Sequence, residues 1–577
     1  MKEQIEKLIH ETLKTLNIEE VNFSVEHPDD FKNGDYSTNV AMVCAKNLKT
    51  NPRELAEKIV MTLREAQDEF HINEIQVAGP GFINFYLSRE FFTESIDDVL
   101  KQKENWGKGD VLKDKKVMVE YTDPNPFKPF HIGHLMANAI GESISRIVEF
   151  SGAKTVRANY QGDVGPHVAK AIYGLMQSGL PDENLSTGEK AQYIGKCYSE
   201  GSNLYDTDEN IKKEIEIINK KVYEKSDEEI NKIYDWGRKI TLLAFEDIYK
   251  ILGTKFDYYF FESEMAKIGE KIVRENTGKT VSDEDDRIIF EESDNAVVFH
   301  GENYDKKLHT RVFINSQGLP TYEAKEIGLA ITKFEKENPD ISIVTTAIEQ
   351  AEYMKVVQKA ISLMHPELES RMKHITHGMM KLATGKMSSR KGNIITGESL
   401  LHDSMDMVFE KMTEREISIE EKKKIGEVVG VAALKYSILK SSLGSDIIYD
   451  ADKSISFDGD SGPYLQYTAV RANSILKKAE GFDTKDKTDI PTEITDLEKL
   501  IYKFSEVVKY SYEELEPHHI TNYLTELASS FNSFYGNTQI LVADNKYALY
   551  HLSLIKAFYQ TMKNGLWLLG IEIPERM

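Results

Sequence analysis

The fold is decided by a stretch that reads Val117-Met118-Val119-Glu120-Tyr121, then Thr122-Asp123-Pro124-Asn125-Pro126-Phe127-Lys128-Pro129-Phe130, then His131-Ile132-Gly133-His134. Its first five residues have the pattern of a short buried strand, and the next nine form a turn rich in proline and asparagine. A helix is predicted from about residue 131 to 150. Residues 155–160 have the pattern of another strand. Strand, crossover helix and strand make up the βαβ unit of a parallel sheet, so an α/β fold is expected.

The regions on either side of this stretch differ in pattern and predict three domains. Residues 1–106 combine amphipathic helices with short strands, as in a small α+β module. Residues 107–417 hold the parallel sheet, interrupted by a charged helical insertion at about 180–252. Residues 418–577 have mostly helical periodicity and are expected to form an all-helical bundle. Further strand patterns of the middle region lie at 287–290, 296–299, 311–314 and 341–346.

Composition and charge restrict the class of protein. The chain has 577 residues, with 72 Lys or Arg and 95 Asp or Glu, which gives a formal charge of −23. Phosphate binding usually brings an excess of Lys and Arg, so this charge argues against a basic nucleic-acid coat. Cys44 and Cys197 have no CxxC neighbour, which excludes a Cys-based zinc site and favours a reducing cytoplasm. No window approaches ~18 consecutive apolar residues, so no membrane span is expected.

The first candidate functional segment is Lys128-Pro129-Phe130-His131-Ile132-Gly133-His134, at the predicted start of the helix. The free N–H groups and the positive dipole end of a helix N-terminus favour an anion. His131 and His134 are three residues apart, share one helix face and can both donate hydrogen bonds to a phosphate. Gly133 has no side chain and lets a flat group such as adenine approach the backbone. A helix start with incidental histidines is the structural alternative for so short a string.

The second segment, Gly385-Lys386-Met387-Ser388-Ser389-Arg390-Lys391-Gly392, follows about 250 residues later. Residues 381–391 carry four basic side chains and no acidic one, with a glycine on either side of the core. Such lysines stabilise the charge that develops on a triphosphate in a transition state. Taken alone, however, the run is more typical of an exposed basic turn.

In this order and separation on a parallel α/β sheet, the two segments resemble the HIGH and KMSKS signatures of class I aminoacyl-tRNA synthetases. Here they are His131-Ile132-Gly133-His134 and Lys386-Met387-Ser388-Ser389-Arg390. Other segments, along nearly the whole chain, resemble the arginyl-tRNA synthetases of that class. These segments are 119–130, Asn159-Tyr160-Gln161-Gly162-Asp163, 252–257 with Glu262-Ser263, 34–41, 78–85, 462–467, 531–535 and 568–577.

The resemblance implies a fold and a reaction. The fold is a Rossmann-type catalytic domain, an additional N-terminal domain that contacts the outer corner of tRNA, and a helical anticodon-binding domain. The reaction is that of an arginine–tRNA ligase: ATP converts L-arginine to arginyl-adenylate, and the arginyl group passes to the 2′-hydroxyl of the terminal adenosine of tRNA(Arg). AMP and pyrophosphate are released. Mg²⁺ is expected to arrive with ATP rather than in a protein metal site, and a cytoplasmic monomer is expected.

Positions that match the family imply the site residues. A planar guanidinium favours a carboxylate partner, which makes Glu326 the main expected partner of the arginine side chain. The catalytic residues are His131, His134 and Lys386. The ATP-binding residues are Lys128, His131, Gly133, His134, Lys386, Met387, Ser388 and Ser389. The arginine-binding residues are Asp123, Pro124, Asn125, His134, Tyr322, Glu326 and Gln350.

The chain departs from the family pattern at three places. The family usually has Ser where this chain has Asp123, and an Arg-Asp pair where it has Lys325-Glu326. It usually has His where this chain has Tyr353. Glu326 keeps the charge but is longer by one methylene group. Asp123 either pairs with the substrate ammonium or caps the turn. These departures bear on the geometry of the arginine pocket more than on the identity of the substrate.

Three other functions fit part of the pattern. A different nucleotidyl transferase can carry the HxGH element, but such enzymes are usually much smaller and lack a helical bundle. A synthetase-like RNA-binding protein without activity is disfavoured by the intact His131, Gly133, His134 and Lys386. A class I synthetase for another amino acid is supported only by Glu326 and is disfavoured by the N-terminal module.

The contacts with tRNA are less well defined. Aromatic residues recur at helical spacing near the end of the chain, where they either form the core or stack on anticodon bases. Residues 1–110 carry a net charge of −8 and residues 461–577 one of −3, so tRNA is expected to meet limited basic patches on an acidic body. The insertion is a solvated helical pair or a clamp on the acceptor stem. The aromatic residues are Tyr464, Tyr467, Phe531, Phe534 and Tyr535.

Overall fold

The computed structural model describes residues 1–65, 70–383, 396–414, 416–482, 489–542 and 545–577. Within these residues the chain forms two compact units. The first comprises Met1–Gly107, Arg471–Glu506 and Thr525–Asn564, and the second comprises Lys108–Val470, Val507–Leu524 and Gly565–Met577. Of the helices described, none is long and apolar enough to cross a membrane.

The first unit contains an antiparallel sheet of four strands in the order β1-β2-β4-β3. The helix after residue 50 begins at Pro52 because the Asn51 side chain accepts hydrogen bonds from the backbone N–H groups of Arg53 and Glu54. Tyr36 and Phe85, which pair across β2 and β4, are fully buried in the core. The elements are α1 Lys2–Thr15, β1 Val25–Glu26, β2 Tyr36–Thr38, α2 Val40–Leu48, α3 Pro52–Leu63, β3 Ile72–Ala78, β4 Phe82–Leu87 and α4 Arg89–Gln102.

The C-terminal region is helical and contributes to both units. Phe531 is fully buried and stacks on Phe558 with ring centroids 4.0 Å apart, whereas Tyr535 is 42 % exposed. Phe531 is therefore a core residue, and anticodon stacking stays a prediction for Tyr535. The helices are α13 Gly397–Lys411, α14 Ile419–Leu439, α15 Ala451–Ser454, α16 Gly462–Ala479, α17 Asp496–Glu514, α18 His518–Asn537 and α19 Ala548–Leu568.

The second unit is built on a parallel sheet of five strands in the order β12-β11-β5-β6-β7. The predicted βαβ unit is confirmed, since β5 pairs in parallel with β6 and α5 connects them. Helix α5 packs closely on the end of β5, because a Cβ atom at Gly141 would lie 2.2 Å from the Cβ atom of Tyr121. The elements are β5 Lys116–Glu120, α5 Ile132–Phe150, β6 Lys154–Gln161, β7 Tyr258–Phe261, α10 Glu262–Asn276, α11 Tyr322–Glu337, β11 Ile341–Ala347, α12 Ala351–Met364 and β12 Met372–His377.

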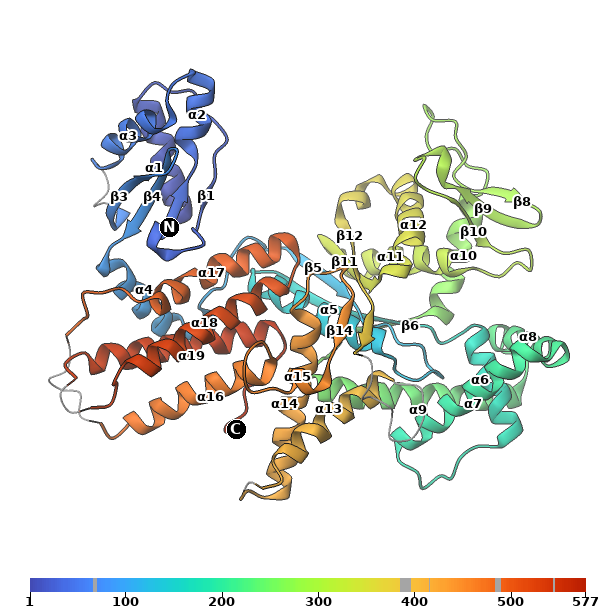
Figure 1. The fold of residues 1–577 in the computed structure, drawn as a ribbon. Helices are drawn as coiled ribbons and strands as arrows, with labels where there is room; N and C mark the ends of the chain where they lie inside the picture. The colour runs from blue at the N-terminus through green and yellow to red at the C-terminus, as the bar shows by residue number, and fades with distance from the viewer. Residues whose placement is uncertain (66–69, 384–395, 415, 483–488, 543–544) are drawn as a thin grey trace. The chain divides into compact units, whose positions relative to one another are not determined.

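The predicted insertion between β6 and β7 consists of helices joined by short loops (Figure 1). Its buried positions include Ile194, Ile215 and Tyr234, which share one cluster with Phe127 of the turn after β5. The helices are α6 Pro166–Ser178, α7 Thr187–Thr207, α8 Glu209–Glu224 and α9 Glu228–Leu252.

A small antiparallel sheet of order β10-β9-β8 lies outside the parallel sheet (Figure 1). The strand predicted at 287–290 is wrong, because β8 begins only at Glu291. The Ile289 N–H donates to the Lys279 carbonyl 3.0 Å away, so this apolar run packs against the preceding loop. A second pair, β13 with β14, adds a short strand to the region expected to be all helical. The bounds are β8 Glu291–Ser293, β9 Ala296–His300, β10 Thr310–Ile314, β13 Met380–Leu382 and β14 Ile447–Tyr449.

Candidate active site

The predicted site residues gather at the carboxyl end of the parallel sheet. The strand order reverses between β5 and β11, which pair in parallel. In open α/β sheets, ligands bind in the crevice outside the carboxyl ends of the strands at such a reversal. The turn after β5, the start of α5, the start of α11 and the segment after β11 all supply predicted residues. Lys386, Met387, Ser388 and Ser389 lie outside the described residues.

The turn after β5 is held in an unusual backbone conformation. Asp123 has a φ of +46°, and its Oδ1 atom accepts a hydrogen bond from the Tyr160 N–H at 2.7 Å. Pro124 beside it is buried. The contact ties the turn to β6, as the capping alternative requires, and contact with the substrate ammonium stays a prediction. Burial, together with the negative charge of Glu120, raises the pKa of Asp123 well above its usual range.

Asn125 faces the end of β6. A Cβ atom at Gly162 would lie 2.1 Å from Asn125 Oδ1 and 3.2 Å from Glu262 Oε1. Only glycine at 162 therefore leaves room for these two side chains. The amide of Asn125 and the carboxylate of Glu262 consequently border the same small space at the switch point.

The two signature histidines lie at the start of α5. His131 is the N-cap residue, its N–H donates to His134 Nδ1 at 3.3 Å, and the two rings stack with centroids 3.4 Å apart. Because Nδ1 of His134 accepts this bond, its proton resides on Nε2, which remains a donor. A Cβ atom at Gly133 would lie 3.0 Å from His131 Cε1, so glycine leaves room for the His131 ring.

The histidines are neutral near pH 7. Burial and the neighbouring Lys128 charge lower the pKa of His131 to about 4. Burial, then the charges of His131 and Lys128, lower the pKa of His134 well below its usual range. Lys128 itself lies over the Tyr198 ring, with its Nζ atom 5.4 Å from the centroid. The start of α5 thus presents neutral hydrogen-bond donors beside one ammonium group.

The region predicted to bind arginine contains more carboxylates than cations. Lys333 pairs with Glu120 at 2.8 Å and Lys325 pairs with Glu262 at 2.9 Å, and all four side chains are buried. Glu326 has no ion pair within the part of the chain that the structure describes. Burial and the charge of Glu120 raise its pKa to about 8. The site therefore has an uncompensated carboxyl group that a cationic substrate would stabilise in its ionised form.

Tyr322 is the first residue of α11, and Gln350 lies in the segment between β11 and α12. Tyr322 is 59 % exposed, and its ring centroid lies 5.0 Å from Lys325 Nζ. The Tyr353 hydroxyl donates to Gln350 Oε1 at 3.4 Å. Burial and then the charge of Glu326 raise the pKa of Tyr353, which places the tyrosine close to that carboxylate. The structure thus brings α11 and the segment after β11 to the same side of the site.

The described residues that flank the second signature are anchored next to the first one. On one side, β13 ends at Leu382 and pairs with β14. On the other side, the Gly397 N–H at the start of α13 donates to the Phe130 carbonyl at 2.8 Å. A Cβ atom at Gly397 would lie 2.7 Å from the His131 carbonyl oxygen. The start of α13 is therefore fixed directly on the segment that leads into His131.

Sequence reasoning missed two groups of side chains. Buried Asp163 accepts hydrogen bonds from Ser263 N–H (2.8 Å), Arg238 Nε (2.9 Å) and the Tyr234 hydroxyl (3.1 Å). The second group is the two buried lysine–glutamate pairs around Glu326. The segments that contain Asp163, Glu262 and Ser263 were recognised as motifs, but their mutual contact needs the fold. Among the described residues, no cluster of His, Cys, Asp or Glu could hold a metal ion.

Comparison with known proteins places this geometry in a family. The chain matches the models for the arginyl-tRNA synthetase N-terminal domain over residues 3–87, the catalytic domain of class I (R) tRNA synthetases over 95–451 and the DALR anticodon-binding domain over 465–577. The chain belongs to the arginyl-tRNA synthetase family. Membership along the whole chain disfavours both a smaller nucleotidyl transferase and a synthetase for another amino acid.

Relatives and solved structures agree with this family along their whole length. The arginine–tRNA ligase of Halothermothrix orenii is 30 % identical, covering 100 % of this chain and 99 % of the relative. That of Clostridium perfringens is 30 % identical, with 99 % of each chain covered. The arginyl-tRNA synthetase of Thermus thermophilus has a TM-score of 0.80 at 23 % identity, with both chains covered completely. That of Plasmodium falciparum has a TM-score of 0.79 at 20 % identity, covering 100 % of this chain and 99 % of the other. This chain therefore has the same fold as these two solved arginyl-tRNA synthetases.

Proposed function

We propose that this arginine–tRNA ligase works in two steps at the β5–β11 switch point. The carboxylate of L-arginine attacks the α-phosphate of ATP, which forms arginyl-adenylate and releases pyrophosphate. The 2′-hydroxyl of the terminal adenosine of tRNA(Arg) then attacks the arginyl carbonyl, which forms the ester and releases AMP. The observation that carries this proposal is that one unit of the structure holds both a pair of neutral histidine donors at the start of α5 and a carboxyl group, that of Glu326, without an ion pair among the described residues.

The ATP side of the site is assigned to the start of α5 and to the second signature. His131 and His134 donate hydrogen bonds to the α-phosphate, where negative charge builds up as the carboxylate attacks. Because both are neutral, they donate without bringing a proton that the reaction would have to remove. Gly133 is assigned to the adenine, and Lys128, Lys386, Met387, Ser388 and Ser389 are assigned to the phosphates. Mg²⁺ enters with ATP, held by phosphate oxygens and water.

The arginine side of the site is assigned to the carboxylate-rich pocket. Glu326 pairs with the guanidinium, whose fork of N–H donors matches a carboxylate. Tyr322 and Gln350 border the same substrate, and Asn125 with Pro124 and His134 holds the end that reacts. Asp123 fixes the turn, and its carboxyl group is the second candidate partner of the substrate ammonium.

The tRNA is assigned to all three domains. Residues 1–106 meet the outer corner, residues 107–417 hold the acceptor end with the insertion at about 180–252, and residues 418–577 bind the anticodon. The exposed ring of Tyr535 offers a stacking surface for an anticodon base. We propose a cytoplasmic monomer, which sedimentation of the purified enzyme and fractionation of its source cells would test.

The deciding experiment is pyrophosphate exchange from ATP, run for each amino acid with and without tRNA(Arg). Exchange is expected with arginine when tRNA is present. Citrulline, which has nearly the shape of arginine but no charge, is the matched control and is expected to give no exchange, because it leaves Glu326 without a cation. Exchange with another amino acid, or none with arginine and tRNA, would overturn the assignment.

A further inference from the structure

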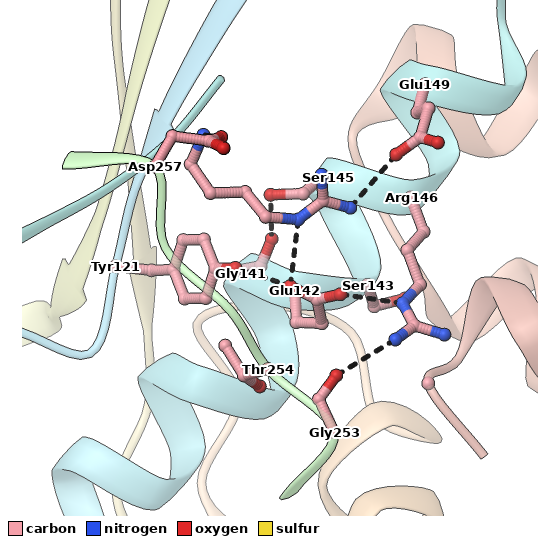
Figure 2. Close-up of polar contacts among 12 residues, drawn as sticks. Tyr121, Gly141, Glu142, Ser143, Ser145, Arg146, Glu149, Gly253, Thr254 and Asp257 are labelled. Carbon is pink, nitrogen blue, oxygen red and sulfur yellow. Dashed lines mark hydrogen bonds and ion pairs between the residues drawn. The ribbon is translucent and has the colours of Figure 1, made fainter. Parts of the chain in front are cut away.

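The middle of α5 carries a buried carboxylate that is saturated with partners. Glu142 is 3 % exposed, and its Oε1 atom accepts from Arg146 Nε at 2.7 Å. Its Oε2 atom accepts from Arg157 Nε of β6 at 3.1 Å and from the Tyr121 hydroxyl after β5. Figure 2 shows Tyr121 and Arg146 on either side of Glu142. Arg157 also donates from Nη2 to Glu149 Oε2 at 3.0 Å. The network fixes α5 to the end of β5, through Tyr121, and to the middle of β6, through Arg157.

Arg146 also joins α5 to the ends of two other helices. Its Nη2 atom donates to the carbonyl of Gly253, the C-cap residue of α9, at 3.2 Å (Figure 2). Its Nη1 atom donates to the carbonyl of Trp567, near the end of α19, at 2.9 Å, and its guanidinium lies over the Trp567 ring. Ser143 donates to the Leu568 carbonyl at 2.9 Å. The last carbonyls of a helix lack partners within the helix, and here α5 supplies them.

Lys435 of α14 completes the same junction. It is 1 % exposed, and its Nζ atom donates to the Leu252 carbonyl at 2.6 Å and to the Gly570 carbonyl at 2.7 Å. A Cβ atom at Gly570 would lie 2.8 Å from Nζ, so glycine is needed for this approach. Within the described chain Lys435 forms no ion pair, and burial and the charge of Arg146 lower its pKa to about 7. Two helix C-termini, with their negative dipole ends, thus hold one buried cation, Lys435, and one partly buried cation, Arg146.

Such an arrangement constrains the axial position of the helices. Apolar contacts tolerate small sliding movements, whereas directed hydrogen bonds to individual carbonyls specify one register. Buried charges of this kind add less stability than apolar packing would, so cohesion alone does not account for them. Helix α5 has 19 residues and carries His131 and His134 at its start, so an axial shift at the junction displaces both histidines. A misplacement of about 1 Å can lower a catalytic rate by ~100-fold.

We propose that Arg146 and Lys435 are positioning residues that couple the end of α19, the last helix of the anticodon-binding domain, to the signature histidines on α5. The inference rests on the proposed tRNA-ligase function. A tRNA anticodon bound to that domain then favours one placement of α19, and the junction passes this placement to α5. The residues act through the histidines and touch neither ATP nor arginine.

The test is a ratio of exchange rates in the full-length enzyme. Pyrophosphate exchange with arginine is measured at saturating substrates, once with tRNA(Arg) and once with tRNA(Arg) of altered anticodon. The wild-type ratio is expected to be at least ~5, the lower end of typical coupling between sites. Lys435→Met keeps the apolar stem but loses both hydrogen bonds, and the ratio is expected to fall towards one. The KM values for arginine and ATP are expected to stay within about twofold, since neither substrate contacts the junction.

Matched variants keep the test decisive. Lys440→Met removes an exposed lysine one turn further along, paired with Asp460 at 3.1 Å, and is expected to keep the wild-type ratio. Arg146→Lys retains the charge but cannot reach both helix ends, so an intermediate ratio is expected even if Lys435→Met fails to fold. A wild-type ratio of one would overturn the coupling. So would variants that slow exchange with normal tRNA(Arg) and exchange with the altered anticodon by the same factor, because the ratio would then be unchanged. Absence of any exchange with arginine in the wild type would instead refute the activity itself.

Discussion

Glu142 is a buried glutamate and Glu326 a partly buried glutamate of the parallel-sheet unit, and their surroundings are opposite. Burial on its own raises the pKa of Glu142, but Arg146 and Arg157 outweigh it and hold this pKa below its usual range. Burial and the charge of Glu120 raise the pKa of Glu326 to about 8. The first carboxylate has partners on three elements, and the second has no ion pair within the described chain.

The difference separates a carboxylate that is paired within the protein from one that we propose binds the substrate. A buried ion is stable only when partners compensate its desolvation, and Glu142 obtains them from the protein. Glu326 has no ion pair among the described residues, and its pKa is raised to about 8, so near neutral pH much of this group is protonated. We propose that a bound cation supplies the partner and favours the ionised form. A pocket that destabilises its own carboxylate therefore prefers a guanidinium over a neutral side chain.

The largest effect is expected from Glu142→Gln. Removing this charge from the buried network takes away the ion pair of Arg146 and leaves Arg157 with Glu149 alone, so the free energy of unfolding is expected to fall by ~3–5 kcal/mol. Denaturant unfolding measures this change in the free energy of unfolding. Glu149→Gln is the matched control, because Glu149 is half-exposed and pairs with Arg157 alone, so its loss is expected to cost below ~1 kcal/mol. Equal losses for the two variants would contradict the structural role of Glu142.

Glu326→Gln is expected to act on the substrate instead. Loss of the charged partner weakens arginine binding by ~2–5 kcal/mol, which raises the arginine KM at least ~30-fold. The free energy of unfolding is expected to stay the same or rise, because an uncompensated group has been removed. Steady-state exchange kinetics measure the KM, with Glu323→Gln on the same helix as control; Glu323 lies near Arg311 and is expected to change the KM by less than ~3-fold. A near-normal KM for Glu326→Gln would show that another group binds the guanidinium.

Tyr121→Phe tests the contribution of a single partner of Glu142. The variant removes the hydroxyl that donates to this carboxylate but leaves both arginines in place. A hydrogen bond to a charged group contributes ~1.5–3 kcal/mol, so thermal or chemical unfolding is expected to show a loss of that size. The arginine KM is expected to remain unchanged, and a large rise in KM would mean that the Glu142 network and the arginine pocket are not separate.

The smallest effect is expected from pH. The proposed pairing of Glu326 with arginine needs the carboxylate ionised, and the pKa of Glu326 is raised to about 8. As pH rises towards 8, the arginine KM is expected to fall by about tenfold per unit, or ~1.4 kcal/mol, and to level off above it. Unfolding has the opposite sign: the folded state retains this proton between the usual glutamate pKa and about 8, so the contribution of Glu326 to stability falls as pH rises through that window. Glu326→Gln should abolish both slopes, and a persistent KM slope would assign them to another group.

Secondary structure that depends on residues close together in the chain could be predicted from the sequence. The strand, turn and helix around His131 were predicted because burial patterns and the start of a helix depend on neighbours within a few residues. The β8 strand was displaced from the prediction, because a loop ten residues earlier pairs with the apolar run at Ile289. Asp123 could be assigned to the turn only once β6 was in place to supply the Tyr160 N–H.

The pairs that define the pocket could not be predicted. Lys325 reaches Glu262 across 63 residues, and Lys333 reaches Glu120 across 213. Charged residues on an amphipathic helix usually face water, so nothing local marked Lys333 as buried. The junction at Lys435 likewise depends on the ends of α9 and α19, which only the folded chain brings together.

Asp163 has a consequence for the way the chain folds. Strands β6 and β7 pair although about a hundred residues separate them, and such non-local pairing is slow compared with helix formation. The carboxylate of Asp163 accepts hydrogen bonds from Tyr234 and Arg238 in α9, the last helix before β7. It also accepts one from Ser263, directly after β7. Once α9 has formed and docked there, the remaining chain to β7 is short, and its closure costs little entropy. One side chain next to β6 thus converts a distant strand pairing into a nearly local one.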